Sequence, residues 1–322
     1  MRALSQTTLD GPAGLRLVEI PVPQPRAGEV LIRVAAAGVN FVDLARGRGA
    51  FGVPVAPPFV AGFEAAGEIV ALGDGVPQAA LGTLVVAAGP GAFAEHVIAP
   101  AAAVMPVPAG WSALQAMGLV VNWPTALAAL ALGRLAAGET ILIHAAAGAT
   151  GAAILTLAKH RGARVLAVAS ASKHASVHAD HVLDAADPDL AETVRALTGR
   201  HGADLVIESA GGATFEASLA ATRRITGRVV VIGLSGGEAT IRNWDLVYRH
   251  PIQILGFNLG ALIQSAPQLF GSMMQEMDAL IAAGIIAPAR PTTRPLAEGA
   301  HVLAALERRQ TTGKLALVPP SS

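Results

Sequence analysis

From Glu139 onward, apolar segments of strand length alternate with helical segments, and this alternation constrains the fold more than any other feature. The apolar segments are ETILIHAA (139–146), ARVLAVA (163–169), HVLDA (181–185), ADLVIESA (203–210), GRVVVIG (227–233) and PIQILGF (251–257). Helical patterns occupy 148–162, 172–179, 189–199 and 213–222. Strands that alternate with helices form a parallel, doubly wound sheet, and continuously apolar strands are typical of a sheet covered on both faces. The sequence therefore predicts an α/β domain with a parallel six-stranded sheet.

The first hundred residues have a different pattern, in which short apolar or alternating segments are separated by Gly, Pro and Asp. This pattern predicts a small all-β, barrel-like unit. A helical period then begins at Trp111 and runs to Leu135. A chain of 322 residues exceeds the roughly 250–300 residues at which single cores stop growing. We expect one domain over 1–118, completed by the tail 285–322 with its final strand, and a second domain over 119–284.

Composition excludes several classes of function. The chain has 23 basic and 23 acidic residues and no basic run, so no nucleic-acid partner is expected. It has no cysteine, which excludes disulfides, thiolate zinc sites and a cysteine nucleophile. Apolar windows are interrupted before the roughly 18 residues of a membrane span, and the N-terminus lacks the apolar core of a signal peptide. We therefore expect a soluble cytoplasmic protein without a membrane partner.

The segment HAAAGATGAA (144–153) lies where the first predicted strand meets its helix. Small residues there let the backbone approach a pyrophosphate, which the N–H groups and positive dipole end of the helix would bind. By itself, the pattern A-x-x-G-x-x-G is also typical of a small-residue helix start. At the first strand–helix junction of a six-strand alternation, however, it predicts a dinucleotide turn. The predicted cofactor-binding residues of this turn are Ala147, Gly148, Ala149, Thr150 and Gly151, whereas His144 is interpreted as a strand-end residue.

The end of the second predicted strand indicates which dinucleotide binds. An NAD site places Asp or Glu there to bond the ribose hydroxyls, but this chain has ASASKH at 169–174. Ser170, Ser172 and Lys173 offer hydroxyls and a cation, which suit a 2′-phosphate. The segment therefore favours NADPH, and the alternative is a solvated serine-rich turn.

Seven segments together resemble the zinc-independent quinone oxidoreductase branch of the medium-chain dehydrogenase/reductase superfamily. They are AAAGVNFVDLARGRG (35–49), PFVAGFEAAGEIVALGDGV (58–76), GAFAEHVIAP (91–100), HAAAGATG (144–151), GADLVIESAGG (202–212), GRVVVIG (227–233) and TTGKLALVP (311–319). The resemblance implies a GroES-like β-barrel catalytic domain and a Rossmann domain. It also implies a homodimer formed through the last Rossmann strand, IQILGF (252–257).

The resemblance also bears on zinc. Zinc dehydrogenases of the superfamily have Cys where this chain has Asn40 and His where it has Phe63, and a further ligand falls near Val121. We therefore expect no metal site. Without a Lewis acid, alcohol oxidation is difficult, whereas hydride transfer onto a polarised conjugated acceptor is easier. The predicted activity is NADPH-dependent reduction of a quinone or related conjugated carbonyl. The alternatives are a specialised biosynthetic enoyl or enone reductase and an NADPH-binding protein with little catalytic activity; a zinc-dependent alcohol dehydrogenase would require the metal.

The resemblance implies further site residues. It places Asn40 beside the nicotinamide, where its amide would hold a substrate carbonyl or the cofactor, and Thr125 against the same region; the alternatives are a turn asparagine and a helix-capping hydroxyl. Additional cofactor contacts are expected from Ser209, Gly211, Gly233, Asn258 and Lys314, the last toward the 2′-phosphate unless it is a solvated lysine. The expected substrate pocket contains Phe41, Phe51, Asn122, Trp123 and Phe257. Ala45 and Phe51 stand where relatives commonly have tyrosines, so the proton is expected from solvent.

Overall fold

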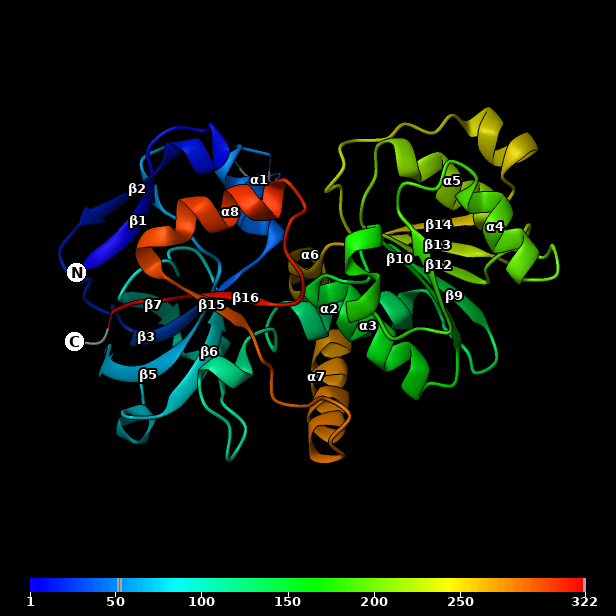
Figure 1. The fold of residues 1–322 in the computed structure, drawn as a ribbon. Helices are drawn as coiled ribbons and strands as arrows, with labels where there is room; N and C mark the ends of the chain where they lie inside the picture. The colour runs from blue at the N-terminus through cyan, green and yellow to red at the C-terminus, as the bar shows by residue number, and fades with distance from the viewer. Residues whose placement is uncertain (51, 53, 321–322) are drawn as a thin grey trace. The chain divides into compact units, whose positions relative to one another are not determined.

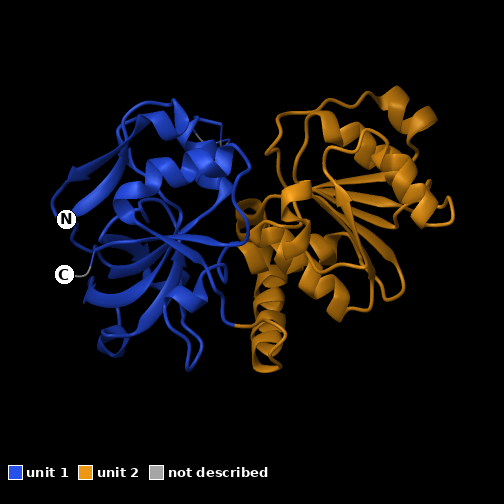
Figure 2. Cartoon of the chain, viewed as in Figure 1, with its two compact units in different colours: residues 1–121, 288–322 blue, residues 122–287 orange. Residues whose placement is uncertain are grey.

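The computed structural model describes residues 1–50, 52 and 54–320, and the chain divides into two compact units (Figures 1 and 2). Unit 1 comprises Met1–Val121 and Pro288–Ser322, and unit 2 comprises Asn122–Ala287. The boundaries predicted from the sequence, after residues 118 and 284, each lie three residues earlier than the boundaries of these units. Phe51, predicted for the substrate pocket, lies outside the described residues.

Unit 2 is built on a six-stranded sheet in which every neighbouring pair is parallel. Its strands are β9 (Thr140–Ile143), β10 (Arg164–Ala169), β11 (His181–Asp184), β12 (Leu205–Glu208), β13 (Arg228–Val231) and β14 (Gln253–Gly256). Their order across the sheet is β11-β10-β9-β12-β13-β14. The chain thus builds outward from β9 in one direction and then, from β12, in the other, which gives a topological switch point between β9 and β12. The predicted doubly wound sheet is confirmed.

Helices cover both faces of this sheet (Figure 1), α2 and α3 on one side and α4 and α5 on the other. The helices of unit 2 are α2 (Asn122–Leu132), α3 (Ala149–His160), α4 (Leu190–Leu197), α5 (Ala213–Ala221), α6 (Leu259–Ser265) and α7 (Pro267–Ala282), with a 3₁₀ helix at Ala171–Ser176 and a π-helical turn at Asp245–Arg249. Burial explains the apolar strands, because Ile141, Leu142 and Ile143 of β9 are all 0% exposed.

Two predicted helices differ in the structure. The helical period from Trp111 gives only a 3₁₀ turn at Leu114–Ala116 before α2 begins at Asn122. Gly118 lies between them with φ +96°, a backbone conformation that cannot continue a helix. The segment predicted as a helix over 172–179 is the short 3₁₀ helix Ala171–Ser176, which is too short to bury an amphipathic face.

Unit 1 contains two sheets. β1 (Arg2–Gln6), β2 (Leu15–Glu19) and β4 (Phe59–Val60) form a three-stranded sheet. The larger sheet has the order β15 (Thr292–Pro295), β16 (Leu315–Val318), β3 (Glu29–Val39), β5 (Glu64–Leu72), β6 (Leu84–Ala88) and β8 (Val104–Pro106), with β7 (His96–Pro100) also pairing with β3. Its helices are α1 (Phe41–Gly47) and α8 (Gly299–Glu307), with 3₁₀ turns at Gly11–Gly14, Gln78–Ala80, Ala101–Ala103 and Leu296–Glu298. Register shifts in β3, between Leu31 and Ile32 and between Val34 and Ala36, bend the strand.

The C-terminal tail packs into unit 1. β16 pairs with β3 in antiparallel register, with Leu315 opposite Val39 and Leu317 opposite Ala37. Leu296, Val302 and Leu317 from the tail belong to the same buried core as residues of β1, β3 and β5. The tail therefore supplies one wall of the first domain's core, although it follows the second domain in sequence.

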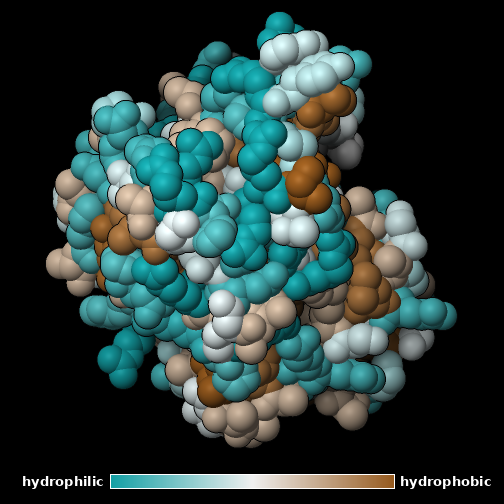
Figure 3. Space-filling model, turned by 90° about the vertical axis from the view of Figure 1, so that its right-hand side faces the viewer, coloured by the Kyte–Doolittle hydropathy of each residue, from teal (hydrophilic) through white to brown (hydrophobic). Residues whose placement is uncertain are grey.

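The surface of unit 2 has an open sheet edge, because β14 ends the strand order. Exposed apolar side chains in this unit include Trp244, Val247 and Tyr248. The face in Figure 3 is largely hydrophilic with separate apolar patches. In the part of the chain that the structure describes, no helix has both the length and the apolar character that crossing a membrane requires.

Candidate cofactor and active site

The predicted phosphate-binding turn follows β9 and leads into α3. Ala145 adopts φ +50°, which turns the chain sharply, and Gly148 accepts an extended conformation at the N-cap of α3. The backbone N–H of Gly148 donates to the carbonyl of Ala145 over 2.9 Å. The N-cap residue, Gly148, has no side chain that could cap the helix. The first N–H groups of α3 therefore carry the partial positive charge that favours a bound anion.

Gly151 is required by the close approach of α3 to the turn. A Cβ atom at this position would lie 2.7 Å from Cα of Ala146 and even closer to the carbonyl oxygen of Ala145. At Gly148 the corresponding approach to Ala145 O is 3.3 Å, so that position tolerates a side chain better. Thr150, in the first turn of α3, accepts a hydrogen bond of 2.9 Å from Nδ2 of Asn122. This bond joins the N-terminus of α2 to the predicted cofactor turn.

The end of β10 carries the residues predicted for the 2′-phosphate. Ser170 directly follows the strand, and Ser172 and Lys173 lie in the 3₁₀ helix Ala171–Ser176. Ser172 is exposed, whereas Ser170 and Lys173 are half-buried. Because β10 is parallel to β9 and adjacent to it, this segment lies at the same sheet edge as the glycine turn. No acidic residue occurs between 169 and 179.

The loops after β12 and β13 bring together another group of predicted cofactor residues. Ser209 O accepts the backbone N–H of Ser235 over 3.2 Å, and a Cβ at Gly233 would lie 3.0 Å from the same oxygen. Gly211 has φ +68°, a left-handed conformation that favours glycine. These two loops therefore form one backbone surface at the carboxyl edge of the sheet.

In unit 1, Asn40 lies in a buried polar cluster with Glu64 and Lys314. Asn40 is the N-cap residue of α1 and is 7% exposed. Its Nδ2 donates to Oε2 of Glu64 over 2.9 Å and to Gly38 O over 3.3 Å, and its Oδ1 accepts from Nζ of Lys314 over 2.8 Å. Lys314 also forms an ion pair with Glu64, which is 0% exposed. The carboxamide of Asn40 is thereby held in one orientation.

Asp43 is a second buried acid beside this cluster. Its Oδ2 accepts the backbone N–H of Asn40 over 2.8 Å, while Oδ1 is buried without a hydrogen-bond partner in the described part of the chain. Burial raises the pKa of Asp43 from 3.8 to about 7, against the lowering effect of the hydrogen bond from Asn40 and of the Lys314 charge. Asp43 therefore takes up or releases a proton near neutral pH.

Lys314 directly precedes β16 and belongs to unit 1, whereas Ser170, Ser172 and Lys173 belong to unit 2. Its ammonium contacts Glu64 and Asn40, and its side chain is 8% exposed, so it is not the solvated lysine of the alternative interpretation. The predicted contact of Lys314 with a 2′-phosphate stays a prediction.

The remaining predicted residues lie in separate places. Thr125 and Trp123 are half-buried in the first turn of α2. Phe41 begins α1 and is 39% exposed, and Phe257 directly follows β14. Asn258 caps α6, where its Oδ1 accepts the N–H of Ala261 over 2.9 Å. Their roles in binding stay predictions.

Sequence reasoning missed a buried network in unit 2 that joins His144, Glu208 and Ser218, which are 3%, 0% and 0% exposed. The signal for it was a polar residue at the end of each of two apolar strands, since His144 follows β9 and Glu208 ends the neighbouring β12. Carboxyl ends of adjacent parallel strands meet at one sheet edge, so these side chains had to lie close together.

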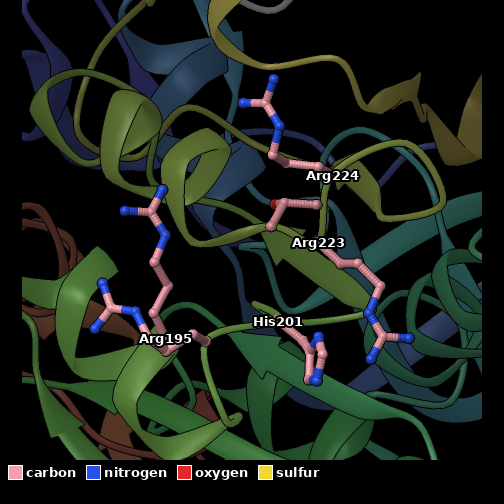
Figure 4. A pocket seen from close by; sticks show the side chains of 6 residues that line it. Arg195, His201, Arg223 and Arg224 are labelled. Carbon is pink, nitrogen blue, oxygen red and sulfur yellow. The ribbon is translucent and has the colours of Figure 1, made fainter.

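One pocket of about 560 Å³ lies elsewhere in unit 2, lined by Arg195, Arg200, His201, Thr222, Arg223 and Arg224. These residues precede β12 and β13, so the pocket lies at the amino ends of the strands, opposite the predicted cofactor edge. In Figure 4 the side chains of Arg223 and Arg224 point in different directions. Asp204 pairs with Arg223, and Arg249 O accepts from Arg224 over 2.8 Å. The arginines therefore do not converge on one anion.

Metal ligands do not gather in the described residues: no group of three or more His, Cys, Asp or Glu side chains is placed to hold an ion. The predicted absence of zinc nevertheless stays a prediction, which metal analysis of the purified protein would test.

Two family models match the chain. The alcohol dehydrogenase GroES-like domain matches residues 26–109, and the zinc-binding dehydrogenase model matches residues 149–278. Together they cover segments of unit 1 and unit 2 respectively. The second matched segment contains none of Asn40, Phe63 and Val121, so the match does not bear on zinc at those positions.

Solved structures are similar over the whole chain. A mycobacterial protein in complex with NADPH is 32% identical, with a TM-score of 0.92 over 99% of this chain and 100% of that one. Escherichia coli quinone oxidoreductase, also in complex with NADPH, is 28% identical, with a TM-score of 0.88 over 99% of this chain and 100% of that one. The CurK enoyl reductase is 27% identical, with a TM-score of 0.88 over 99% of both chains.

Curated relatives include much longer proteins. A mycocerosic acid synthase-like polyketide synthase from Mycobacterium tuberculosis is 30% identical over 92% of this chain, which spans only 14% of the synthase. The full-length similarity to the mycobacterial structure, the two matching domains and the observed sheet order agree with the resemblance seen in the sequence. This chain belongs to the medium-chain dehydrogenase/reductase superfamily, in its quinone oxidoreductase branch.

Proposed function

We propose that this protein is an NADPH-dependent, zinc-independent reductase that transfers hydride to a quinone or a related conjugated carbonyl compound. The observation that carries the proposal is the turn after β9. The turn lies beside the switch point of the sheet. The backbone of Gly151 packs so closely against Ala145 and Ala146 that no side chain fits between them. Doubly wound sheets bind dinucleotides at this place, with the pyrophosphate at the helix N-terminus.

All predicted cofactor-binding residues except Lys314 are in unit 2. The N–H groups of Ala149–Gly151 would bind the pyrophosphate, and Ser170, Ser172 and Lys173 would bind the 2′-phosphate. A carboxylate at the end of β10 would repel that phosphate, and none occurs in the segment. NADPH supplies the hydride when bound. The two NADPH complexes among similar structures support this choice of cofactor.

The substrate class follows from the chemistry that the remaining residues offer. Asn40, Phe63 and Val121 stand at positions where zinc dehydrogenases of the superfamily have zinc ligands. None of these three residues is a good zinc ligand. The acceptor therefore has to be polarised already, as a quinone or enone is. We propose that Asn40 of unit 1 orients its carbonyl, because Glu64 and Lys314 fix the amide of Asn40. The roles of Phe41, Trp123 and Thr125 stay predictions.

A second candidate is a biosynthetic enoyl reductase, which is favoured by the similarity to an enoyl reductase structure and to polyketide synthases. Steady-state rates with NADPH separate the two. The proposal predicts a higher kcat/KM for 9,10-phenanthrenequinone than for small enones or α,β-unsaturated acyl thioesters. A preference for the thioesters would establish the second candidate, and turnover that requires added zinc would overturn both.

A further inference from the structure

The buried network of unit 2 is centred on the carboxylate of Glu208, the last residue of β12. Its Oε1 accepts the backbone N–H groups of Ala210 over 2.7 Å and of Gly211 over 2.8 Å. Its Oε2 accepts the hydroxyl of Ser218 on α5. Both oxygens of the buried carboxylate therefore have hydrogen-bond donors.

His144 completes the network from the neighbouring strand. Its Nε2 lies 2.9 Å from Oγ of Ser218 and 3.7 Å from Oε2 of Glu208. Burial lowers the pKa of His144, which keeps the ring neutral. Ser218 has one hydroxyl hydrogen, and the carboxylate is the stronger of its acceptors, so Nε2 of His144 carries a proton and donates it to Ser218 Oγ.

This arrangement does not form a hydrolytic triad. In such a triad the histidine lies between serine and acid and accepts the hydroxyl proton. Here the serine lies between the histidine and the acid. Ser218 as a whole is 0% exposed, so no substrate reaches its hydroxyl. The network instead braces backbone, because the N–H groups bound by Glu208 belong to the turn that leaves β12.

The position of that turn indicates what it serves. A sheet of this order consists of two mononucleotide-binding halves, and the phosphate turn and 2′-phosphate residues lie in the half formed by β9, β10 and β11. The half formed by β12, β13 and β14 is therefore expected to bind the nicotinamide nucleotide. Ala210 O also accepts the N–H of Gly236 over 2.5 Å, so the braced turn supports the loop after β13 as well.

We propose that His144, Ser218 and Glu208 form a positioning network that fixes the turn Ser209–Gly211 and thereby places the nicotinamide half of NADPH. This inference rests on the proposed function. The network acts through backbone, so none of its three side chains needs to contact the cofactor. The proposal predicts that disrupting the network weakens binding of the nicotinamide half of NADPH only. A general loss of stability would weaken binding of both halves.

The test compares NADPH with 2′,5′-ADP, a fragment that retains the 2′-phosphate and the adenosine but lacks the nicotinamide nucleotide. Ser218→Ala removes the hydroxyl that joins His144 to Glu208. We expect the Kd of NADPH to rise about tenfold, as for an unsatisfied buried group, while the Kd of 2′,5′-ADP stays within about twofold of wild type. The matched control is Ser272→Ala on α7. The Oγ of Ser272, like that of Ser218, lies 3.1 Å from a backbone carbonyl oxygen one turn earlier, but Ser272 is exposed.

A second pair of variants keeps the inference testable if Ser218→Ala does not fold. His144→Gln retains an N–H donor toward Ser218 and is expected to keep most of the NADPH affinity, whereas His144→Leu is expected to lose it selectively. An equal loss of affinity for NADPH and for 2′,5′-ADP in these variants would overturn this inference but not the proposed function. Unchanged NADPH affinity in Ser218→Ala and His144→Leu would do the same. Failure of the wild-type protein to bind either ligand would overturn the proposed function and this inference with it.

Discussion

Replacing Lys314 by Met removes the cation that balances a fully buried carboxylate. Glu64 is 0% exposed, and its Oε2 accepts from Lys314 over 2.5 Å and from Asn40 over 2.9 Å, while Oε1 accepts the N–H of Gly118. After the substitution, Glu64 keeps neutral donors but no countercharge. Loss of one partner from a buried ion pair costs about 3–5 kcal/mol, a large share of a typical stability of about 5–15 kcal/mol.

Strands β3 and β5 provide an exposed ion pair as a matched control. Arg33 on β3 pairs with Glu68 on β5, but these side chains are 51% and 39% exposed. Arg33→Met is therefore expected to cost less than about 1 kcal/mol. Adding Glu64→Gln to Lys314→Met removes the unbalanced charge and should recover part of the loss, which gives a coupling energy in a double-mutant cycle.

The assay is urea unfolding at pH 7, followed by the fluorescence of Trp111. Trp111 lies in unit 1, whereas Trp123 and Trp244 lie in unit 2, so replacing the latter two by Phe isolates the signal of unit 1. A loss for Lys314→Met no larger than that for Arg33→Met, or a coupling energy near zero, would refute the reasoning. It would mean that the pair is solvated in the folded protein.

Three further predictions follow from the structure. Because burial raises the pKa of Asp43 from 3.8 in the unfolded chain to about 7, its contribution to stability is complete below pH ~4 and is lost as pH rises through 7; the difference amounts to at most about 4 kcal/mol. Asp43→Asn should therefore flatten the urea stability profile between pH 4 and 8, and an unchanged profile would contradict this. Gly151→Ala should cost about 1–3 kcal/mol and weaken NADPH binding, because the new methyl overlaps the turn, and Gly148→Ala should destabilise less; equal effects in thermal unfolding would argue against the close approach. Ile254→Lys on the open edge β14 should convert a dimer into a monomer in sedimentation equilibrium, since edge lysines block strand pairing; a monomeric wild type would rule out the predicted interface.

The sequence was sufficient for the sheet of unit 2, because each of its strands is an apolar run bounded by helix or turn signals. ETILI and GRVVVI are buried on both faces, and burial of this kind leaves a clear pattern. The short elements β1, β4, β8 and β15 were not predicted. They have few residues, and their pairing depends on partners that lie far away in sequence, as for Ser5 with Val60.

The polar clusters were harder to predict for the same reason. Lys314 lies 250 residues from Glu64, and Ser218 lies 74 residues from His144, so no local spacing connects them. Backbone turns such as 144–151 were predictable because their small residues are consecutive. The interactions that hold Asn40 and the turn at Ser209–Gly211 became visible only when the fold brought the strands together.

The measurement that tests the central claim most directly is calorimetric titration of the wild-type protein with NADPH and with NADH. A charge-assisted bond to the 2′-phosphate contributes about 1.5–3 kcal/mol, so NADPH should bind at least about tenfold more tightly, and Lys173→Ala should reduce that preference by about tenfold. Equal affinity for the two cofactors, or a preference for NADH, would contradict the account.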